Sequence, residues 1–113
     1  MNNFKEISLA KGEVLFEAGA PADKLYLIQS GAVGMADKSG RVFVTLKAGE
    51  SFGEQALLAG GVRSAAAQAV GATACLEITA QGLRDLLAKE GGIATQVLEA
   101  LLLQLYMHNA IKR

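Results

Sequence analysis

The sequence predicts a mainly β fold with flanking helices, in which short antiparallel strands form a sandwich, roll or barrel and helices follow them. Two observations support this prediction. Glycines divide the first half of the chain into short segments that are rich in β-branched, aromatic and aliphatic residues. From Thr79 onward leucines recur three and four positions apart, which is typical of a helix. A chain of 113 residues supports one hydrophobic core, so we expect a single domain over 1–113.

Seven segments have the composition of strands. In the segment 24–30, Leu25 and Leu27 alternate with Tyr26 and Ile28, as expected where successive side chains point to opposite faces of a sheet. All the strands are expected within about 4–79. They are 6–10, 14–18, 24–30, 32–37, 41–47, 63–70 and 72–79.

Turn-forming residue pairs separate several of these segments. The pairs are Ala20-Pro21, Ser30-Gly31, Ser39-Gly40 and Ala48-Gly49. We expect Gly31, Gly40 and Gly49 to be turn residues with no chemical role.

Two helices are expected after the strands, over about 80–90 and 92–112. Thr79 is available as the N-cap of the first helix, and Gly91-Gly92 separates the two. The leucines that indicate the first helix are Leu83, Leu86 and Leu87.

Composition excludes several classes of function. Lys and Arg equal Asp and Glu in number, so a broad surface for nucleic acid or an anionic membrane is not expected. Cys75 is the one cysteine and His108 the one histidine, which excludes an intramolecular disulfide and a structural zinc site within one chain. Cys75 lies in an apolar run, as a small core residue does. With no signal peptide, and with the apolar segment 97–107 too short to cross a bilayer, we expect a cytoplasmic protein without a transmembrane segment.

The segment "FGEQALLAGGVRSAA" (52–66) contains one carboxylate and one guanidinium among small and apolar residues. Gly53 precedes a predicted helix of one to two turns, whose first N–H groups favour an anion. Arg63 follows a Gly-Gly turn and can hold two phosphate oxygens, while Glu54 suits a hydroxyl group. An anion site beside a hydroxyl site fits a sugar phosphate. The small residues that leave room for it are Ala56, Ala65 and Ala66.

This segment resembles the phosphate-binding cassette of cyclic nucleotide-binding domains. That family includes regulatory subunits of cyclic-nucleotide-dependent kinases, cyclic-nucleotide-gated channels and bacterial regulators of the catabolite-activator type. "GEVLFEAGAPADKLYLIQSGAV" resembles the opening strands of these domains, and "LKAGESFGE" resembles the approach to the cassette. The resemblance covers nearly the whole chain. It implies an antiparallel, jelly-roll-like β-roll with a short cassette helix and two C-terminal helices.

The chain departs from the family pattern in two places. The helical segment that usually precedes the first strand is expected to be short or absent. After the last predicted helix, we expect no helix-turn-helix, kinase or channel segment within these 113 residues.

The resemblance also implies a ligand, a cyclic nucleoside monophosphate, with cAMP preferred to cGMP and no catalytic cofactor. It implies that Glu54 accepts the ribose 2′-hydroxyl and that Arg63 pairs with the exocyclic phosphate oxygens. Ser64 permits either purine base. His108 and Asn109 fall near the depth at which relatives contact the base from the last helix, while a solvated or interface histidine is the alternative for His108. The ligand-binding residues implied are Gly53, Glu54, Gln55, Ala56, Arg63, Ser64 and Ala65.

Other interpretations remain open at this stage. Glu54 and Arg63 are alternatively a partly buried ion pair, although such a pair contributes little net stability. A domain that kept the cassette and lost its affinity is a second alternative, serving as a structural or dimerisation module. An enzyme is disfavoured because the sequence offers neither a cluster of metal ligands nor an evident acid and base, so we expect binding without turnover.

The last predicted helix, over about 93–111, is apolar nearly all round. Packing against the strands buries only part of such a surface, and exposed apolar patches usually mark interfaces. We therefore expect a homodimer through this helix, or its contact with an effector domain absent from this chain.

Overall fold

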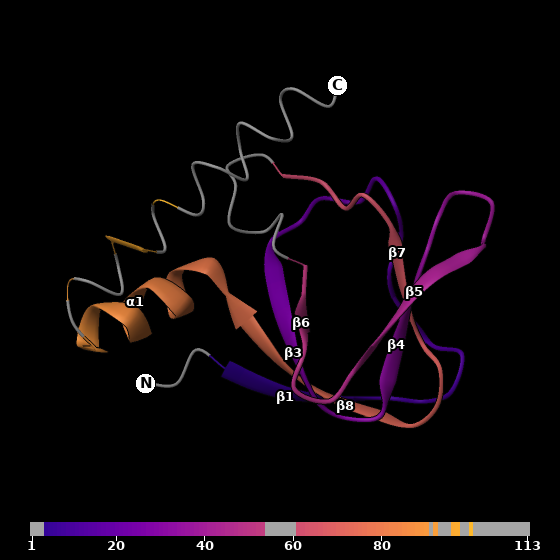
Figure 1. The fold of residues 1–113 in the computed structure, drawn as a ribbon, viewed down its shortest axis with the longest axis horizontal. Helices are drawn as coiled ribbons and strands as arrows, with labels where there is room; N and C mark the ends of the chain where they lie inside the picture. The colour runs from indigo at the N-terminus through magenta and orange to yellow at the C-terminus, as the bar shows by residue number, and fades with distance from the viewer. Residues whose placement is uncertain (1–3, 54–60, 91, 93–95, 98–99, 101–113) are drawn as a thin grey trace.

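The computed structural model describes residues 4–53, 61–90, 92, 96–97 and 100. Within them, eight strands form two four-stranded antiparallel sheets, and one helix follows (Figure 1). The predicted mainly β, antiparallel fold is confirmed. The predicted cassette helix lies outside the described residues, and so does most of the predicted helix over 92–112. The single domain over 1–113 stays a prediction.

Each sheet combines strands that are distant in sequence. One sheet has the order β1-β8-β3-β6, and the other has the order β2-β7-β4-β5. The strand bounds are β1 Phe4–Leu9, β2 Val14–Phe16, β3 Lys24–Ser30, β4 Ala32–Ala36, β5 Val42–Lys47, β6 Ser51–Phe52, β7 Ala66–Ala69 and β8 Thr73–Thr79.

Two features differ from the predicted strands. The two-residue strand β6 was not predicted, because its pairing with Tyr26 and Leu27 is long-range and too short to leave a periodic pattern. The strand predicted over 63–70 begins only at Ala66. The reason is that Arg63 pairs with the turn near Ala20, where its N–H donates to the Ala20 carbonyl at 2.8 Å.

The hydrophobic core lies between the two sheets. Ile28 of β3, Val33 of β4 and Cys75 of β8 are each less than 2% exposed, so Cys75 is confirmed as a small core residue. Tyr26 and Phe52 stack beside them with ring centroids 5.2 Å apart. The core therefore extends to β6, the strand that directly precedes Gly53 of the candidate site.

Positive backbone φ angles confirm the predicted turn glycines. Gly31, Gly40 and Gly49 have φ values of 86°, 87° and 91°. At Gly31 a Cβ would also collide with the backbone of Ala72, so this turn requires glycine for two reasons. At Gly40 nothing lies within 4 Å of a Cβ.

Helix α1 (Ala80–Glu90) continues directly from β8 and packs against it. The Thr79 hydroxyl accepts a hydrogen bond from the Gly82 N–H at 2.9 Å, which confirms Thr79 as the N-cap. Leu83 and Leu87 are half-buried. No helix in the described part of the chain is long and apolar enough to span a membrane.

Candidate functional site

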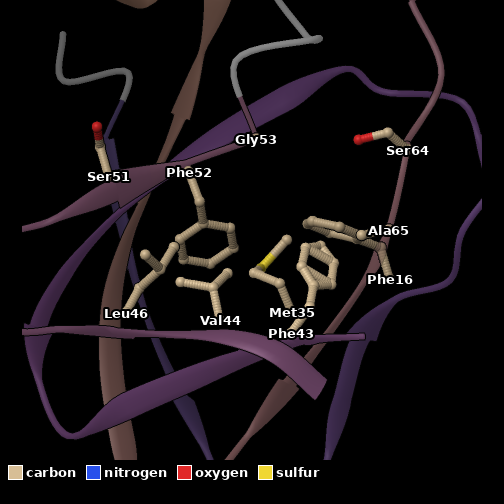
Figure 2. Close-up of a pocket in the computed structure, with 10 residues that line it drawn as sticks. All are labelled: Phe16, Met35, Phe43, Val44, Leu46, Ser51, Phe52, Gly53, Ser64 and Ala65. Atoms are coloured by element: carbon tan, nitrogen blue, oxygen red, sulfur yellow. The ribbon is translucent and has the colours of Figure 1, made fainter. Parts of the chain in front are cut away.

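A cavity of about 280 Å³ opens between the two sheets, at the point where the chain leaves β6 (Figure 2). Its volume is close to the lower end of the range for small-molecule sites. The residues that line it come from β2, β4, β5, β6 and the segment before β7. They are Phe16, Met35, Phe43, Val44, Leu46, Ser51, Phe52, Gly53, Ser64 and Ala65.

The cavity has an apolar interior and a polar rim. Figure 2 shows Ser51, Gly53 and Ser64 along one rim, above a layer of apolar side chains. Ser51 and Ser64 are the only lining residues in the described part with polar side chains. Phe43 on the opposite wall is 59% exposed, which is unusual for a large aromatic side chain. The cavity therefore suits a ligand with one polar end and one flat apolar part.

Arg63 lies behind the rim, where it is only 3% exposed and is not among the lining residues. Its Nη1 donates to the Gly53 carbonyl at 3.2 Å, and its Nη2 donates to the Lys24 carbonyl at 2.7 Å. Its guanidinium carbon lies 4.0 Å from the centroid of the Phe16 ring. A full positive charge is thus held directly behind the cavity wall.

Gly53 separates this charge from the cavity. Its φ of 88° favours glycine, and a Cβ at this position would lie 2.8 Å from the Arg63 Nη1. Because Gly53 has no side chain, the guanidinium contacts its backbone, and little more than this backbone lies between the guanidinium and the cavity. An anion at the Gly53 side of the cavity would consequently lie close to the guanidinium.

Tyr26 connects the aromatic residues under the site to β8. Its hydroxyl donates to Glu77 Oε2 at 3.3 Å, and its ring centroid lies 5.8 Å from the Arg63 guanidinium carbon. Burial, and after it the neighbouring Glu77 carboxylate, raises the pKa of Tyr26 to about 12, while Arg63 opposes the rise. The phenol therefore stays protonated at any ordinary pH.

The structure brings together part of the predicted site. Gly53, Ser64 and Ala65 line the cavity, and Arg63 lies directly behind Gly53. Ala66, expected to leave room for the ligand, is the first residue of β7 and does not line the cavity. The other predicted residues lie outside the described part of the chain. They are Glu54, Gln55, Ala56, His108 and Asn109.

Two aromatic residues of the site that lie outside the segment 52–66 were not predicted. Phe16 contacts both the guanidinium and the cavity, and Phe43 forms the exposed wall. Both belong to segments whose composition indicates only strands, and no local spacing marks them as site residues. The described residues contain no group of three or more His, Cys, Asp or Glu side chains that could hold a metal ion.

Comparison with known proteins identifies relatives. The family model described as cyclic nucleotide-binding domain matches residues 6–90, more than half of the chain. An uncharacterised NTE family protein of Mycobacterium tuberculosis is 33% identical over 90 residues, which cover 80% of this chain and 15% of that protein. The chain thus spans a small part of the length of this curated relative.

Two solved structures of bacterial regulators have similar folds. The catabolite activator protein of Thermus thermophilus gives a TM-score of 0.74 at 30% identity, over 97% of this chain and 53% of that chain. The N-terminal domain of a transcriptional regulator from Streptomyces coelicolor gives 0.73 at 28% identity, over 96% of this chain and 80% of that chain. The two sheets described above therefore form a β-roll like that of the catabolite activator protein.

Proposed function

The chain belongs to the cyclic nucleotide-binding domain family, and from this premise we propose that it is a regulatory sensor domain. Its ligand is a cyclic nucleoside monophosphate, bound in the cavity beside Gly53. One observation carries the proposal. A buried arginine lies against the backbone of Gly53, on the polar side of an otherwise apolar cavity.

The proposed roles follow the two chemical regions of the cavity. Arg63 attracts the cyclic phosphate toward Gly53, because a buried guanidinium in a site of low dielectric acts strongly on an anion. Ser64 and the backbone near Ala65 supply donors at the rim. Glu54 accepts the ribose 2′-hydroxyl, and the remaining residues proposed to contact the ligand are Gln55, Ala56, His108 and Asn109.

The apolar wall supports a preference for cAMP. Guanine carries an exocyclic amino group and a carbonyl in place of the single amino group of adenine, so it needs more hydrogen-bond partners. Phe43, Val44 and Leu46 offer none from their side chains, and a polar group buried without a partner costs about 1–3 kcal/mol. Ser64 and Ser51 reduce this penalty only at the rim.

Binding is proposed to shift the population of two arrangements of the domain, as in other switching proteins. The predicted C-terminal helix over 93–111 then changes its contacts with a second copy or with an effector domain. This part of the proposal rests on the apolar sequence of that segment.

The test is calorimetric titration of nucleotide-stripped protein with cAMP and with cGMP, alongside Arg63→Ala. We expect dissociation constants in the micromolar range or below for cAMP, and weaker binding of cGMP. Arg63→Ala should weaken cAMP binding about 100-fold, since it removes the buried positive charge that attracts the phosphate. Urea unfolding of each variant shows whether the protein remains folded.

Arg41→Ala is the matched control, because it removes the same charge from an exposed turn residue. It should bind cAMP as the wild type does. If neither nucleotide binds to the stripped wild-type protein, the sensor proposal is wrong and a structural or dimerisation module becomes the better interpretation.

A further inference from the structure

We propose that Phe43 is a specificity-determining residue of the cavity, which selects a purine base over a pyrimidine base by stacking its ring on the base. The inference rests on the proposed function, because it takes the ligand to be a cyclic nucleotide. It goes beyond that function by naming the side chain that responds to the size of the base, and the β-bulge that presents this side chain.

The backbone of β5 contains a β-bulge at Phe43. Met35 of β4 lies opposite Val44, and the next residue of β4, Ala36, lies opposite Val42. The chain of β5 thus advances two residues where β4 advances one, so Phe43 is the extra residue of the bulge. Bulges of this kind bend a strand and change the direction of a side chain.

The bulge brings two consecutive side chains to the cavity. In a regular strand neighbouring side chains point to opposite faces, yet Phe43 and Val44 both line the cavity (Figure 2). Leu46 also lines it, two positions after Val44, as regular alternation requires. Val42 is not a lining residue, and its Cγ1 lies 3.4 Å from the place that a Cβ on Gly34 would occupy. Regular alternation would present Val42 to the cavity, and the bulge presents Phe43 in its place.

The ring of Phe43 differs from the other aromatic rings near the cavity. Phe16, Tyr26 and Phe52 pack against one another with ring centroids 5.2 to 6.1 Å apart. Phe43 is 59% exposed, and within the described part of the chain it makes no ring–ring contact. Its aromatic face is therefore open to a ligand.

Protection of an open sheet edge does not account for this ring. Strand β5 is the last strand of its sheet, and a bulge in such a strand discourages pairing with another chain. That effect comes from the backbone, so it needs no aromatic side chain, and an exposed apolar side chain makes unwanted association easier. Contact with a ligand explains why the bulged residue is a phenylalanine that lines the cavity.

Stacking gives the selection its physical basis. Every base has a flat face that can stack on an aromatic side chain. The attraction grows with the area in contact, so the two fused rings of a purine gain more from a phenyl ring than the single ring of a pyrimidine does. An exposed phenylalanine can therefore distinguish the two kinds of base without a hydrogen bond.

The test measures the dissociation constants of cAMP and of cytidine 3′,5′-cyclic monophosphate by calorimetry on nucleotide-stripped protein. The two probes share the same sugar phosphate, so the ratio of their dissociation constants reports on the base alone. The proteins compared are the wild type, Phe43→Leu, Phe43→Tyr and Phe52→Leu. Phe52→Leu is the matched control, because it makes the same change in a lining residue whose ring is already stacked on Tyr26.

We expect the wild type to prefer cAMP about 10-fold, and Phe43→Leu to reduce this preference about 5-fold. Phe43→Tyr should keep the wild-type ratio within about 2-fold, since the aromatic face remains. Phe52→Leu should weaken the binding of both probes and keep the ratio, which is the result expected of a merely structural role.

An unchanged ratio in Phe43→Leu, or equal affinity of the wild type for the two probes, would overturn the selection by Phe43 and leave the proposed function intact. Loss of the preference in Phe43→Tyr would also overturn it, because the aromatic face would then not be the cause. An equal change of the ratio in Phe52→Leu would overturn it as well, since the selection would then belong to the cavity as a whole. If the wild type does not bind cAMP, the proposed function fails, and the inference fails with it.

Discussion

The two walls of the cavity differ sharply in how far they are buried. On one side, Arg63 and Phe52 are 3% and 5% exposed, and the guanidinium is bonded to two backbone carbonyls. On the other side, Phe43 and Val44 of β5 are 59% and 42% exposed, and the neighbouring Val42, which does not line the cavity, is 49% exposed. Strand β5 is also the last strand of its sheet, so it pairs with β4 alone.

This difference indicates that the side chains of one wall stabilise the fold, and that those of the other wall are available to contact another molecule. The buried wall is part of the hydrophobic core, so folding fixes its geometry before any ligand arrives. The exposed wall contributes little to the core, and its apolar area becomes buried only against another molecule. Substitutions in the buried wall should therefore change the free energy of unfolding, and substitutions in the exposed wall should change binding alone.

Gly53→Ala should strongly destabilise the buried wall. The φ of 88° disfavours alanine, and the new Cβ would lie 2.8 Å from the Arg63 Nη1 and 3.2 Å from the Lys24 carbonyl oxygen. We expect a loss of about 3 kcal/mol in the free energy of unfolding, measured by urea denaturation.

Gly40→Ala is the control for this substitution, because it has nearly the same φ, 87°, and open space around the new Cβ. It should cost about 1 kcal/mol, the price of the backbone conformation alone. Equal losses in the two variants would mean that the guanidinium adds nothing to the requirement for glycine at Gly53.

The sequence predicts the local features of the fold better than the long-range contacts of the buried wall. Positive φ at Gly31 and Gly40, and the capping of α1 by Thr79, depend on residues close in sequence, so composition and spacing reveal them. The placement of Arg63 depends on the Gly53 and Lys24 carbonyls, 10 and 39 positions away. No local pattern indicates that the arginine would lie behind the wall instead of facing the cavity.

Ionisation of Tyr26, beneath the buried wall, should change the free energy of unfolding by a smaller amount, and this change depends on pH. Its pKa of about 12 in the folded protein exceeds the ordinary value of 10.0, because burial and Glu77 disfavour the phenolate. A raised pKa of an acid contributes stability that is fully present below pH 10 and is lost as pH rises through 12. We expect a loss on the order of 1 kcal/mol by pH 11, after allowance for solvent screening.

Urea denaturation at a series of pH values tests this, with Tyr26→Phe as the control. The variant lacks the phenol, so the difference in stability between wild type and variant should shrink between pH 10 and 12. A difference that stays constant over this range would show that Tyr26 ionises equally readily in the folded and unfolded chains.

The exposed wall gives the smallest expected effect on stability. Phe43→Ala removes a side chain that is 59% exposed, so the free energy of unfolding should change by less than about 0.5 kcal/mol. Phe52→Ala is the matched comparison, since the same change at a 5% exposed position should cost about 3–5 kcal/mol. Both residues line the cavity, so both variants should weaken nucleotide binding.

A large loss of stability in Phe43→Ala would mean that β5 belongs to the core of the domain, and the division between a structural wall and a binding wall would then be wrong. A small loss, together with weaker binding, would show that this chain keeps a large aromatic side chain exposed in order to contact the ligand.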